Sequence, residues 1–332
     1  MKKFTRLLRN ILLFPMMLAF GAVDANMNTL DGNMSGDNKK FYEKALLERL
    51  LPNLVFCKYG QKRPVPKNEG DTINFRRFES LPVNTDALTE GITPPGTALS
   101  MSTVEAKLKQ YGDYSVITDK LDQMGIDPVI TEASELHGEA AALKYDTIVR
   151  NVVADGSNVF YAAGTGREEV GAANILDSAT IKKAVRALKR QNVKPFEDGF
   201  YIGIIHPDAA YDIQEDQLWQ DISKYNGGAN IVNGEVGKIH KVKFVESTNA
   251  PVFEGAGANG EDVYGTMIIG RDAYGVPELE GEGAPRIIIK YAKDSDSSDP
   301  LEQRNTVGYK GCFTAVRLNE LAMIRVEHGA TV

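Results

Sequence analysis

The chain has 332 residues, of which 42% are hydrophobic and 25% are charged, values that are ordinary for a globular protein with a sizeable core. Its formal net charge of −7 argues against a dedicated nucleic-acid binder, whose contact face would be basic. Cys57 and Cys312 lack metal-ligand spacing and the four histidines are scattered, so we predict no metal centre and expect reduced cysteines.

The N-terminal segment carries two conflicting signals. Four basic residues within the first nine positions precede the apolar run 11–23, and small residues follow where signal peptidase cleaves. Taken alone, this segment favours export, although Pro15 interrupts it too early for a membrane-spanning helix. The alternative is a basic amphipathic arm that docks on another subunit. The polar, Gly/Asn-rich residues 26–37 predict a linker, and residues 41–51 predict a short amphipathic helix.

Residues 71–118 predict a long β-hairpin with a wide loop. In residues 71–78 (DTINFRRF), Ile73 and Phe75 alternate with polar neighbours, which is the period of a half-buried strand. A return strand is expected over 102–117, where Val104, Ala106 and Leu108 alternate with charged residues. The intervening residues 81–99 are rich in Pro, Gly and Thr, and the Pro- and charge-rich residues 61–71 predict a bridge into the hairpin. A hairpin with little core of its own is marginal in isolation, so we expect a neighbour to hold it.

The longest predicted element is a helix over residues 127–153. Asp127 suits the N-cap, and Pro128 suits the first helical position, where its missing N–H costs nothing. Apolar residues then recur at helical spacing until Asp155-Gly156 supplies the stop. At 1.5 Å per residue this helix would span about 40 Å, so it needs a sheet or further helices packed along it. We therefore interpret it as the spine of the fold.

The second half of the chain predicts a mixture of helices and strands. Residues 177–191 and 209–219 have helical patterns, and strands are expected within residues 199–208, 241–247, 263–270, 285–292 and 306–328. The order of hairpin, long helix, mixed insert and closing strands is typical of an α+β fold rather than a doubly wound one.

Two loops imitate ligand-binding motifs without completing them. Gly255, Gly257 and Gly260 spell G-x-G-x-x-G, but a predicted strand follows where a phosphate-binding helix should begin. Residues 294–299 (DSDSSD) resemble the start of a calcium loop but lack its glycine, and Asn305 stands where its final glutamate should be. We therefore expect a flexible loop in the first case and a solvated acidic loop in the second.

No catalytic constellation is visible in the sequence. His206 and Asp208 stand at a predicted strand end, yet no motif places a nucleophile beside them, and Pro207 simply ends the strand. Trp219, the only tryptophan, is more typical of a core or interface anchor than of a substrate platform. We therefore expect no enzymatic activity and no cofactor. A hairpin and an arm that cannot stabilise themselves favour structural self-assembly.

Six ordered blocks of sequence carry a family resemblance: residues 52–82, 88–96 (LTEGITPPG), 111–139, 198–213 (DGFYIGIIHPDAAYDI), 235–248 (EVGKIHKVKFVEST) and 306–328. They resemble the major capsid proteins of tailed bacteriophages, and the closest group is the one typified by coliphage N-four. The likeness covers essentially everything from Phe41 onward. It implies the Hong Kong 97-type capsid fold, which is of the α+β class.

The resemblance also assigns parts of that fold to parts of this chain. The expected parts are an N-terminal arm over 1–70, an extended loop over 71–118, a peripheral domain over 119–178 that holds the spine helix 127–153, an axial domain over 179–277 that gathers around capsomer symmetry axes, and closing strands of the peripheral domain over 278–332.

The implied function is that of a major capsid protein. Such a protein self-assembles as pentamers and hexamers into the icosahedral shell of a virion, in the bacterial host cytoplasm, around double-stranded DNA that it contacts non-specifically at most. Scaffold, portal and decoration proteins are candidate partners, and no membrane is expected. Two alternatives stay open: the shell of an encapsulin-like cellular nanocompartment, and a secreted bacterial surface protein.

The candidate assembly residues lie on the hairpin, the spine and the axial insert. Arg76 and Arg77 are expected to overlie an adjacent subunit, where arginine can fork onto a carboxylate. Glu132 and Glu135 of the spine are candidate acceptors, and Trp219 is a further candidate interface residue. Some shells of this fold are cross-linked through a lysine on the extended loop, but residues 71–106 contain none, so we expect a non-covalent shell.

Overall fold

The computed structural model describes most of the chain after residue 53. The described residues are 26–27, 54–66, 70–125 except 86, 88–89, 92 and 94–95, then 127–216, 235–279, 285–294 and 299–331. The export-like segment, most of the linker, the helix expected over 41–51 and Trp219 lie outside them. The chain divides into two compact units: a first unit of Met1–Glu48, Gly112–Glu139 and Arg286–Lys310, and a second of Arg49–Tyr111, Ala140–Pro285 and Gly311–Val332.

The first unit contains strands that pair around β14. Its elements include β1 (Asn26–Met27), β5 (Lys109–Thr118), α3 (Asp119–Met124), β13 (Arg286–Lys290) and β14 (Arg304–Phe313), in the pairing order β1-β5-β14 with β13 also on β14. A Cβ atom at Gly112 would lie 2.7 Å from the Tyr309 carbonyl oxygen, so glycine allows the close approach of β5 to β14. α3 begins where the Thr118 side chain accepts the N–H of Leu121, an N-cap that satisfies a free helical donor.

The predicted spine helix is confirmed, since α4 spans Val129–Ala154. In the first unit, Val129 packs in one core with Ile117 of β5 and Val307 of β14. His137 Nε2 also lies 3.0 Å from Ser115 Oγ of β5. Strands therefore lie along the helix, as its length required.

The second unit is built on a mixed sheet with the strand order β6-β16-β11-β7-β9-β8. Its strands are β6 (Val159–Tyr161), β7 (Tyr201–Ile205), β8 (Glu235–Ile239), β9 (Val242–Glu246), β11 (Val263–Ile269) and β16 (Met323–His328), and β10 (Val252–Phe253) pairs with β11. β7 runs parallel to β9 and β6 runs parallel to β16, whereas β11 is antiparallel to both of its neighbours on the path. The sheet is therefore not doubly wound, in agreement with the predicted α+β class.

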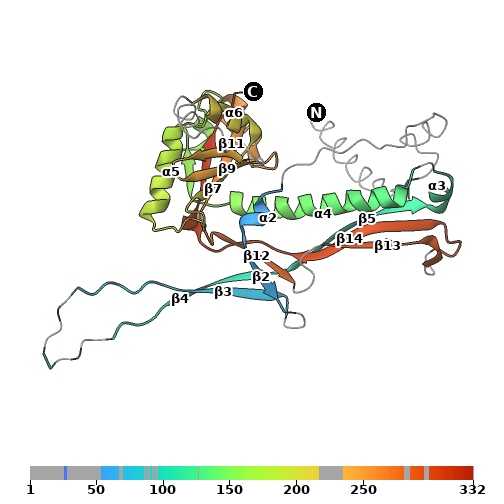
Figure 1. Cartoon of the computed structure of the whole chain (residues 1–332), viewed down its shortest axis with the longest axis horizontal. Helices are drawn as coiled ribbons and strands as arrows, with labels where there is room; N and C mark the ends of the chain where they lie inside the picture. The colour runs from blue at the N-terminus through green and yellow to red at the C-terminus, as the bar shows by residue number, and fades with distance from the viewer. Residues whose placement is uncertain are drawn as a thin grey trace, which may run out of the picture. The chain divides into compact units, whose positions relative to one another are not determined.

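Different helices cover the two faces of this sheet (Figure 1). Tyr201 and Ile205 of β7 pack in a core with α5 (Ser178–Arg190) and α6 (Pro207–Glu215). Ile202 and Ile204 point to the opposite face, where the core includes side chains of α4. None of the described helices is both long enough and apolar enough to cross a membrane.

The predicted hairpin is present, but its return strand is shorter than expected. β3 (Thr72–Phe78) and β4 (Met101–Lys107) pair antiparallel and form a two-stranded ribbon (Figure 1). The expectation of one strand over 102–117 is wrong, because the chain continues from β4 into β5, which belongs to another sheet. The Leu108 N–H donates to the Asp71 carbonyl at 2.7 Å just beyond the last β3–β4 pair. The alternation of apolar and polar residues breaks directly after this point, at Lys109-Gln110, and the expectation of a single strand passed over that break.

The bridge expected over 61–71 is in part a strand, which corrects the prediction. β2 (Gln61–Val65) pairs parallel with β12 (Tyr274–Leu279), which also pairs with β15 (Val316–Arg317). Among the described strands β2 pairs with β12 alone, so it lies at an edge. An edge strand tolerates Pro64, whose ring nitrogen has no hydrogen to donate.

The short helix α2 (Phe56–Tyr59) is anchored in the core of the second unit. Phe56 is fully buried, and the Tyr274 hydroxyl donates to its carbonyl at 2.6 Å. The Cys57 N–H donates to the carboxylate of Asp146 at 3.0 Å, and that wholly buried carboxylate also accepts an asparagine amide at 2.9 Å. Buried polar groups must find such partners, so these bonds fix where the chain enters the core.

The two loops that imitate ligand motifs have different outcomes. Residues Ala258–Gly260 of the glycine motif form a short 3-10 turn, and β11 follows, so the expected strand is confirmed. The expectation of a solvated acidic loop is wrong for Asp299, which is only 9% exposed. Its carboxylate accepts the N–H groups of Gln303 and Arg304, both at 2.9 Å, and thereby closes a turn.

Candidate assembly surfaces

Arg76 and Arg77 lie next to each other in β3, on the hairpin of the second unit (Figure 1). Both side chains are exposed. Arg77 Nη2 lies 3.1 Å from Glu79 Oε1, whereas no ion pair of Arg76 occurs within the described residues. The side chains of neighbouring strand residues point to opposite faces, so the two arginines face different surroundings. Their expected pairing with a neighbouring subunit stays a prediction.

The outer part of the hairpin is apolar as well as exposed. Five large hydrophobic side chains there are 48% to 88% exposed: Phe78, Leu81, Val83, Leu99 and Met101. Phe78 and Met101 are direct cross-strand partners, so the group begins at the last pair of the ribbon. Scattered apolar residues are normal on a surface, but five large ones exposed on a single hairpin are typical of an interaction site. We call these five residues the hairpin patch.

The other candidate residues are less informative. Glu132 of α4 is half-buried and Glu135 is exposed, and both already interact within the chain. Trp219 lies outside the described residues. The role of these three residues in assembly stays a prediction.

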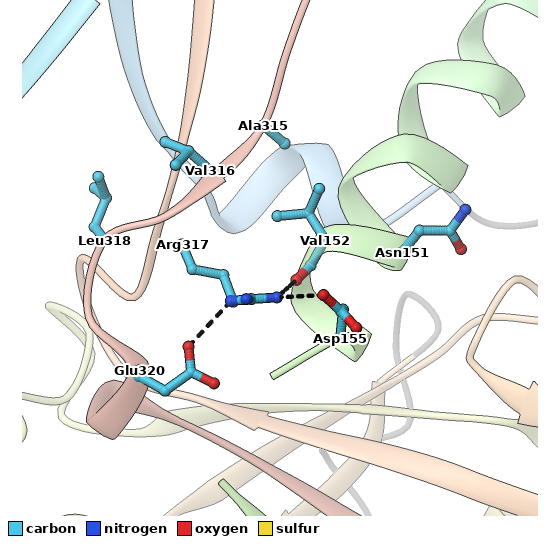
Figure 2. Close-up of a pocket in the computed structure, with 8 residues that line it drawn as sticks. All are labelled: Asn151, Val152, Asp155, Ala315, Val316, Arg317, Leu318 and Glu320. Carbon is cyan, nitrogen blue, oxygen red and sulfur yellow. Dashed lines mark hydrogen bonds and ion pairs between the residues drawn. The ribbon is translucent and has the colours of Figure 1, made fainter. Parts of the chain in front are cut away.

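A hollow of about 850 Å³ lies beside the C-terminal end of α4 (Figure 2). Arg317 Nη1 donates to the Val152 carbonyl at 3.0 Å and lies 3.1 Å from the Asp155 carboxylate, while its Nε lies 3.0 Å from Glu320. A guanidinium in this place satisfies a terminal carbonyl and complements the negative end of the helix dipole. The charged side chains that line the hollow thus bind one another, and the arrangement stabilises the end of the spine helix.

A buried ionic network joins β16 to the 3-10 turn Arg167–Glu169. Glu327 is wholly buried and accepts hydrogen bonds from Arg167 at 2.6 and 2.7 Å and from Arg325 at 2.7 Å. The guanidinium of Arg167 also stacks 3.6 Å above the ring of Phe253. Burial raises the pKa of Glu327, but the bonds from Arg167 and the charge of Arg325 outweigh it, so the net pKa lies below its usual value.

Sequence reasoning missed this network. Its two arginines are far apart in the chain, and no local motif joins them. One signal was present: Arg325 and Glu327 stand two apart in an otherwise apolar strand, so they share one face of a buried sheet. Two charged residues on such a face indicate a buried pair, since an unpaired buried charge is too costly.

The His206–Asp208 pair holds a helix in place. α6 begins with His206 as its N-cap and Pro207 in its first turn, two residues before the predicted start at 209. The Tyr264 hydroxyl of β11 donates to Asp208 at 3.0 Å, and His206 Nδ1 lies 3.0 Å from the same carboxylate. Burial and this bond raise the pKa of Tyr264 to about 12, so the phenol stays protonated at neutral pH. The trio therefore ties α6 to the sheet.

The cysteines and the other potential ligands offer no reactive centre in the part of the chain that the structure describes. Cys57 and Cys312 are free thiols. Burial and the neighbouring Asp146 raise the pKa of Cys57 to about 12, which leaves it a poor nucleophile. Among the described residues, no three His, Cys, Asp or Glu side chains are grouped as a metal site requires.

Comparison with solved structures identifies the class of protein that this architecture defines. The chain matches the capsid of Ralstonia phage GP4 with a TM-score of 0.71 and 14% identity, over 89% of this chain and 96% of that one. It matches the capsid of cyanophage P-SCSP1u with a TM-score of 0.68 and 14% identity, over 88% and 93%. It matches the capsid of Helicobacter pylori bacteriophage KHP30 with a TM-score of 0.65 and 12% identity, over 93% and 99%. The fold is the Hong Kong 97-type capsid fold, as expected.

The sequence itself then gives the family. A family model described as phage capsid protein matches residues 101–326, which is more than half of the chain. The chain therefore belongs to the phage capsid protein family, and it is a major capsid protein that forms the shell of a virion. The nanocompartment and surface-protein alternatives are not favoured. No curated protein matches the chain.

Proposed function

We propose that this protein assembles as pentamers and hexamers into a closed icosahedral shell around the double-stranded DNA of a tailed phage. Its ordered sequence blocks support membership of the N-four-type group within the capsid family. Assembly would take place in the host cytoplasm, with scaffold, portal and decoration proteins as candidate partners and without an enzymatic role for this chain. The division into arm (1–70), extended loop (71–118), axial domain (179–277) and peripheral remainder belongs to the same proposal.

The observation that carries this proposal is the hairpin patch. A two-stranded ribbon has almost no core, and the patch leaves large apolar side chains in water. Covering them with a second subunit would remove that cost and would hold the ribbon in place. A shell repeats this contact at every subunit, so a small gain per contact becomes decisive for the particle.

The patch can be tested by the double substitution Val83→Ser and Leu99→Ser. Their side chains are 88% and 72% exposed, so the subunit should fold normally and lose only the contact to its neighbour. We expect folded subunits by circular dichroism and few closed shells by electron microscopy and light scattering. Leu301→Ser, at a leucine 75% exposed outside the hairpin, is the matched control. Normal shells from the double variant would refute the role of the patch.

The hairpin arginines call for a separate experiment. Changing Arg76 and Arg77 to alanine removes two exposed charges and should give folded subunits that assemble poorly. Lys107→Ala is the control on the same ribbon, because it removes an exposed cation from the end of the ribbon farthest from the hairpin patch, where Lys107 pairs with Asp71 at 3.3 Å. If the double variant forms heat-stable particles like those of the wild type, the arginines are surface charge and have no part in assembly.

A further inference from the structure

Helix α5 carries an unusual concentration of positive charge for a chain whose net charge is −7. Its buried face packs into the core of the second unit through Ile181, Val185 and Leu188. The exposed face has five cations and no carboxylate: Lys182, Lys183, Arg186, Lys189 and Arg190. The whole-chain charge argued against a dedicated nucleic-acid binder, but it conceals this local surface.

The exposed cations of α5 line a groove together with the turn between β8 and β9. The groove has a volume of about 590 Å³, and its wall consists of Lys182, Val185, Arg186, Lys189, Arg190, His240 and Lys241. Apart from Val185 and His240, every lining residue bears a full positive charge. We call this surface the basic groove.

These charges are not neutralised by the described parts of the chain. No ion pair joins the lysines and arginines of the basic groove to a carboxylate among the described residues, whereas Arg77, Arg167 and Arg317 all have one. The effect reaches His240: burial and the charge of Lys182 lower its pKa, and the nearby Asp216 carboxylate offsets only part of that shift. Like charges held this close repel one another, so an anion in the groove would be stabilising.

The turn that brings Lys241 to the groove is itself strained. His240 and Lys241 have φ angles of 48° and 70°, in the left-handed region that such two-residue turns normally fill with Asn or Gly. Strain of this kind is concentrated where a segment positions a ligand contact.

The chemistry of the basic groove favours a phosphate backbone over a protein segment. Protein interfaces are anchored by aromatic and large aliphatic side chains and are depleted in lysine. None of the exposed large hydrophobic side chains in the described part of the chain belongs to α5 or to the β8–β9 turn. No Phe, Tyr or Trp side chain lines the groove for a base to stack on. What remains is a set of long cations, the groups that contact DNA phosphates without reading sequence.

We propose that the basic groove holds the phosphate backbone of packaged double-stranded DNA, independently of its sequence. This inference rests on the proposed function, because it assumes that the shell encloses a DNA genome. It places the contact on α5 and the β8–β9 turn of the second unit. The contact is electrostatic, so it weakens steeply as salt rises.

The test compares DNA binding by unassembled full-length subunits with that of a neutralised variant. The variant combines Lys182→Gln, Arg186→Gln and Lys189→Gln, all at exposed helical positions where glutamine is tolerated. A control carries Arg286→Gln, Lys290→Gln and Lys310→Gln, which remove the same charge from exposed positions of β13 and β14. The probe is a mixed-sequence duplex of about 30 base pairs, titrated at several salt concentrations.

Each phosphate contact contributes about −0.9 to the slope of log affinity against log salt. The neutralised variant should therefore lose up to about three contacts, which is on the order of 100-fold or more in affinity at about 0.1 M salt. The control variant should retain most of the binding. The proposal is overturned if the wild-type subunit does not bind the duplex at low salt, or if both variants lose affinity equally.

Particle formation by the same variants separates this inference from the proposed function. If the neutralised variant forms shells but no longer binds the duplex, the basic groove is supported as a DNA contact. Loss of assembly with unchanged DNA binding would mean that the groove takes an acidic segment of a neighbouring subunit, and the DNA proposal would be wrong. Wild-type subunits that never form shells would instead refute the proposed function.

Discussion

The substitution Glu327→Gln probes a deeply buried charge network of the second unit. Glu327 is fully buried and holds the guanidinium groups of Arg167 and Arg325 through three hydrogen bonds of 2.6 to 2.7 Å. Glutamine has nearly the same shape, so packing is preserved. It keeps one acceptor oxygen, presents an N–H₂ group to donors, and removes the negative charge that both arginines share.

The expected loss can be bounded from the structure. Hydrogen bonds to charged groups contribute about 1.5–3 kcal/mol each, and glutamine must forfeit at least one of the three. Arg325 is only 8% exposed and cannot turn to water, whereas Arg167 is partly exposed and can. Removing one partner of a buried ion pair costs about 3–5 kcal/mol, and we expect Glu327→Gln to fall in this range.

Urea unfolding of unassembled subunits measures the effect, read from the transition midpoint at unchanged slope. Glu278→Gln is the matched control: the same change, in the same unit, at a carboxylate that pairs with a mostly exposed Lys62 at 3.4 Å. A surface pair is worth about 0–1 kcal/mol, so the control should be nearly neutral. A cost below about 1 kcal/mol for Glu327→Gln would refute the claim that the network stabilises the unit.

Four further results are expected. The difference in unfolding free energy between the wild type and Glu327→Gln should shrink as the pH falls through the depressed pKa of Glu327, because a lowered native pKa adds stability only while the carboxylate is ionised. A series of urea midpoints at different pH values measures this difference. Asp146→Ala should leave buried donors unpaired, cost about 2–4 kcal/mol, and speed thiol labelling of Cys57, which Asp146 now suppresses. Gly311→Ala would place a Cβ atom against the Tyr145 hydroxyl oxygen, well inside van der Waals contact, and should lower the unfolding free energy by about 1–3 kcal/mol. Shells boiled in detergent should release monomers, whereas a ladder of larger bands would contradict the non-covalent prediction.

Local chemistry explains which elements were predictable from the sequence. The spine helix was placed to within two residues at each end because Pro128, the apolar period and the Asp155-Gly156 stop are all signals within a few residues. The split between β4 and β5 has one local signal, the polar pair Lys109-Gln110 that ends the alternation of β4, but the change of partner strand depends on residues far away in the chain. β2 was missed because Pro64 argues against a strand unless its position at an edge is known.

The candidate sites likewise divide into features with a local sequence signal and features that depend on residues far apart in the chain. The positive charge of α5 is visible in the sequence, but the basic groove is not. It forms only because the β8–β9 turn, some fifty residues away, brings Lys241 beside the helix. The Arg167–Glu327 bonds join residues that are 160 positions apart. The hairpin arginines were identified from a family resemblance, and a single subunit cannot test a contact made with its neighbour.

The anchoring of α2 has a mechanical consequence. Phe56 is enclosed in the core and its carbonyl is held by Tyr274, so a pull on the chain at residue 54 is resisted first at α2. Extracting the phenylalanine side chain alone would cost about 1.5–3 kcal/mol. Tension that reaches α2 from the preceding residues would thus be borne by the core of the second unit, and proteolytic trimming up to residue 53 would leave Phe56 and Tyr274 in place.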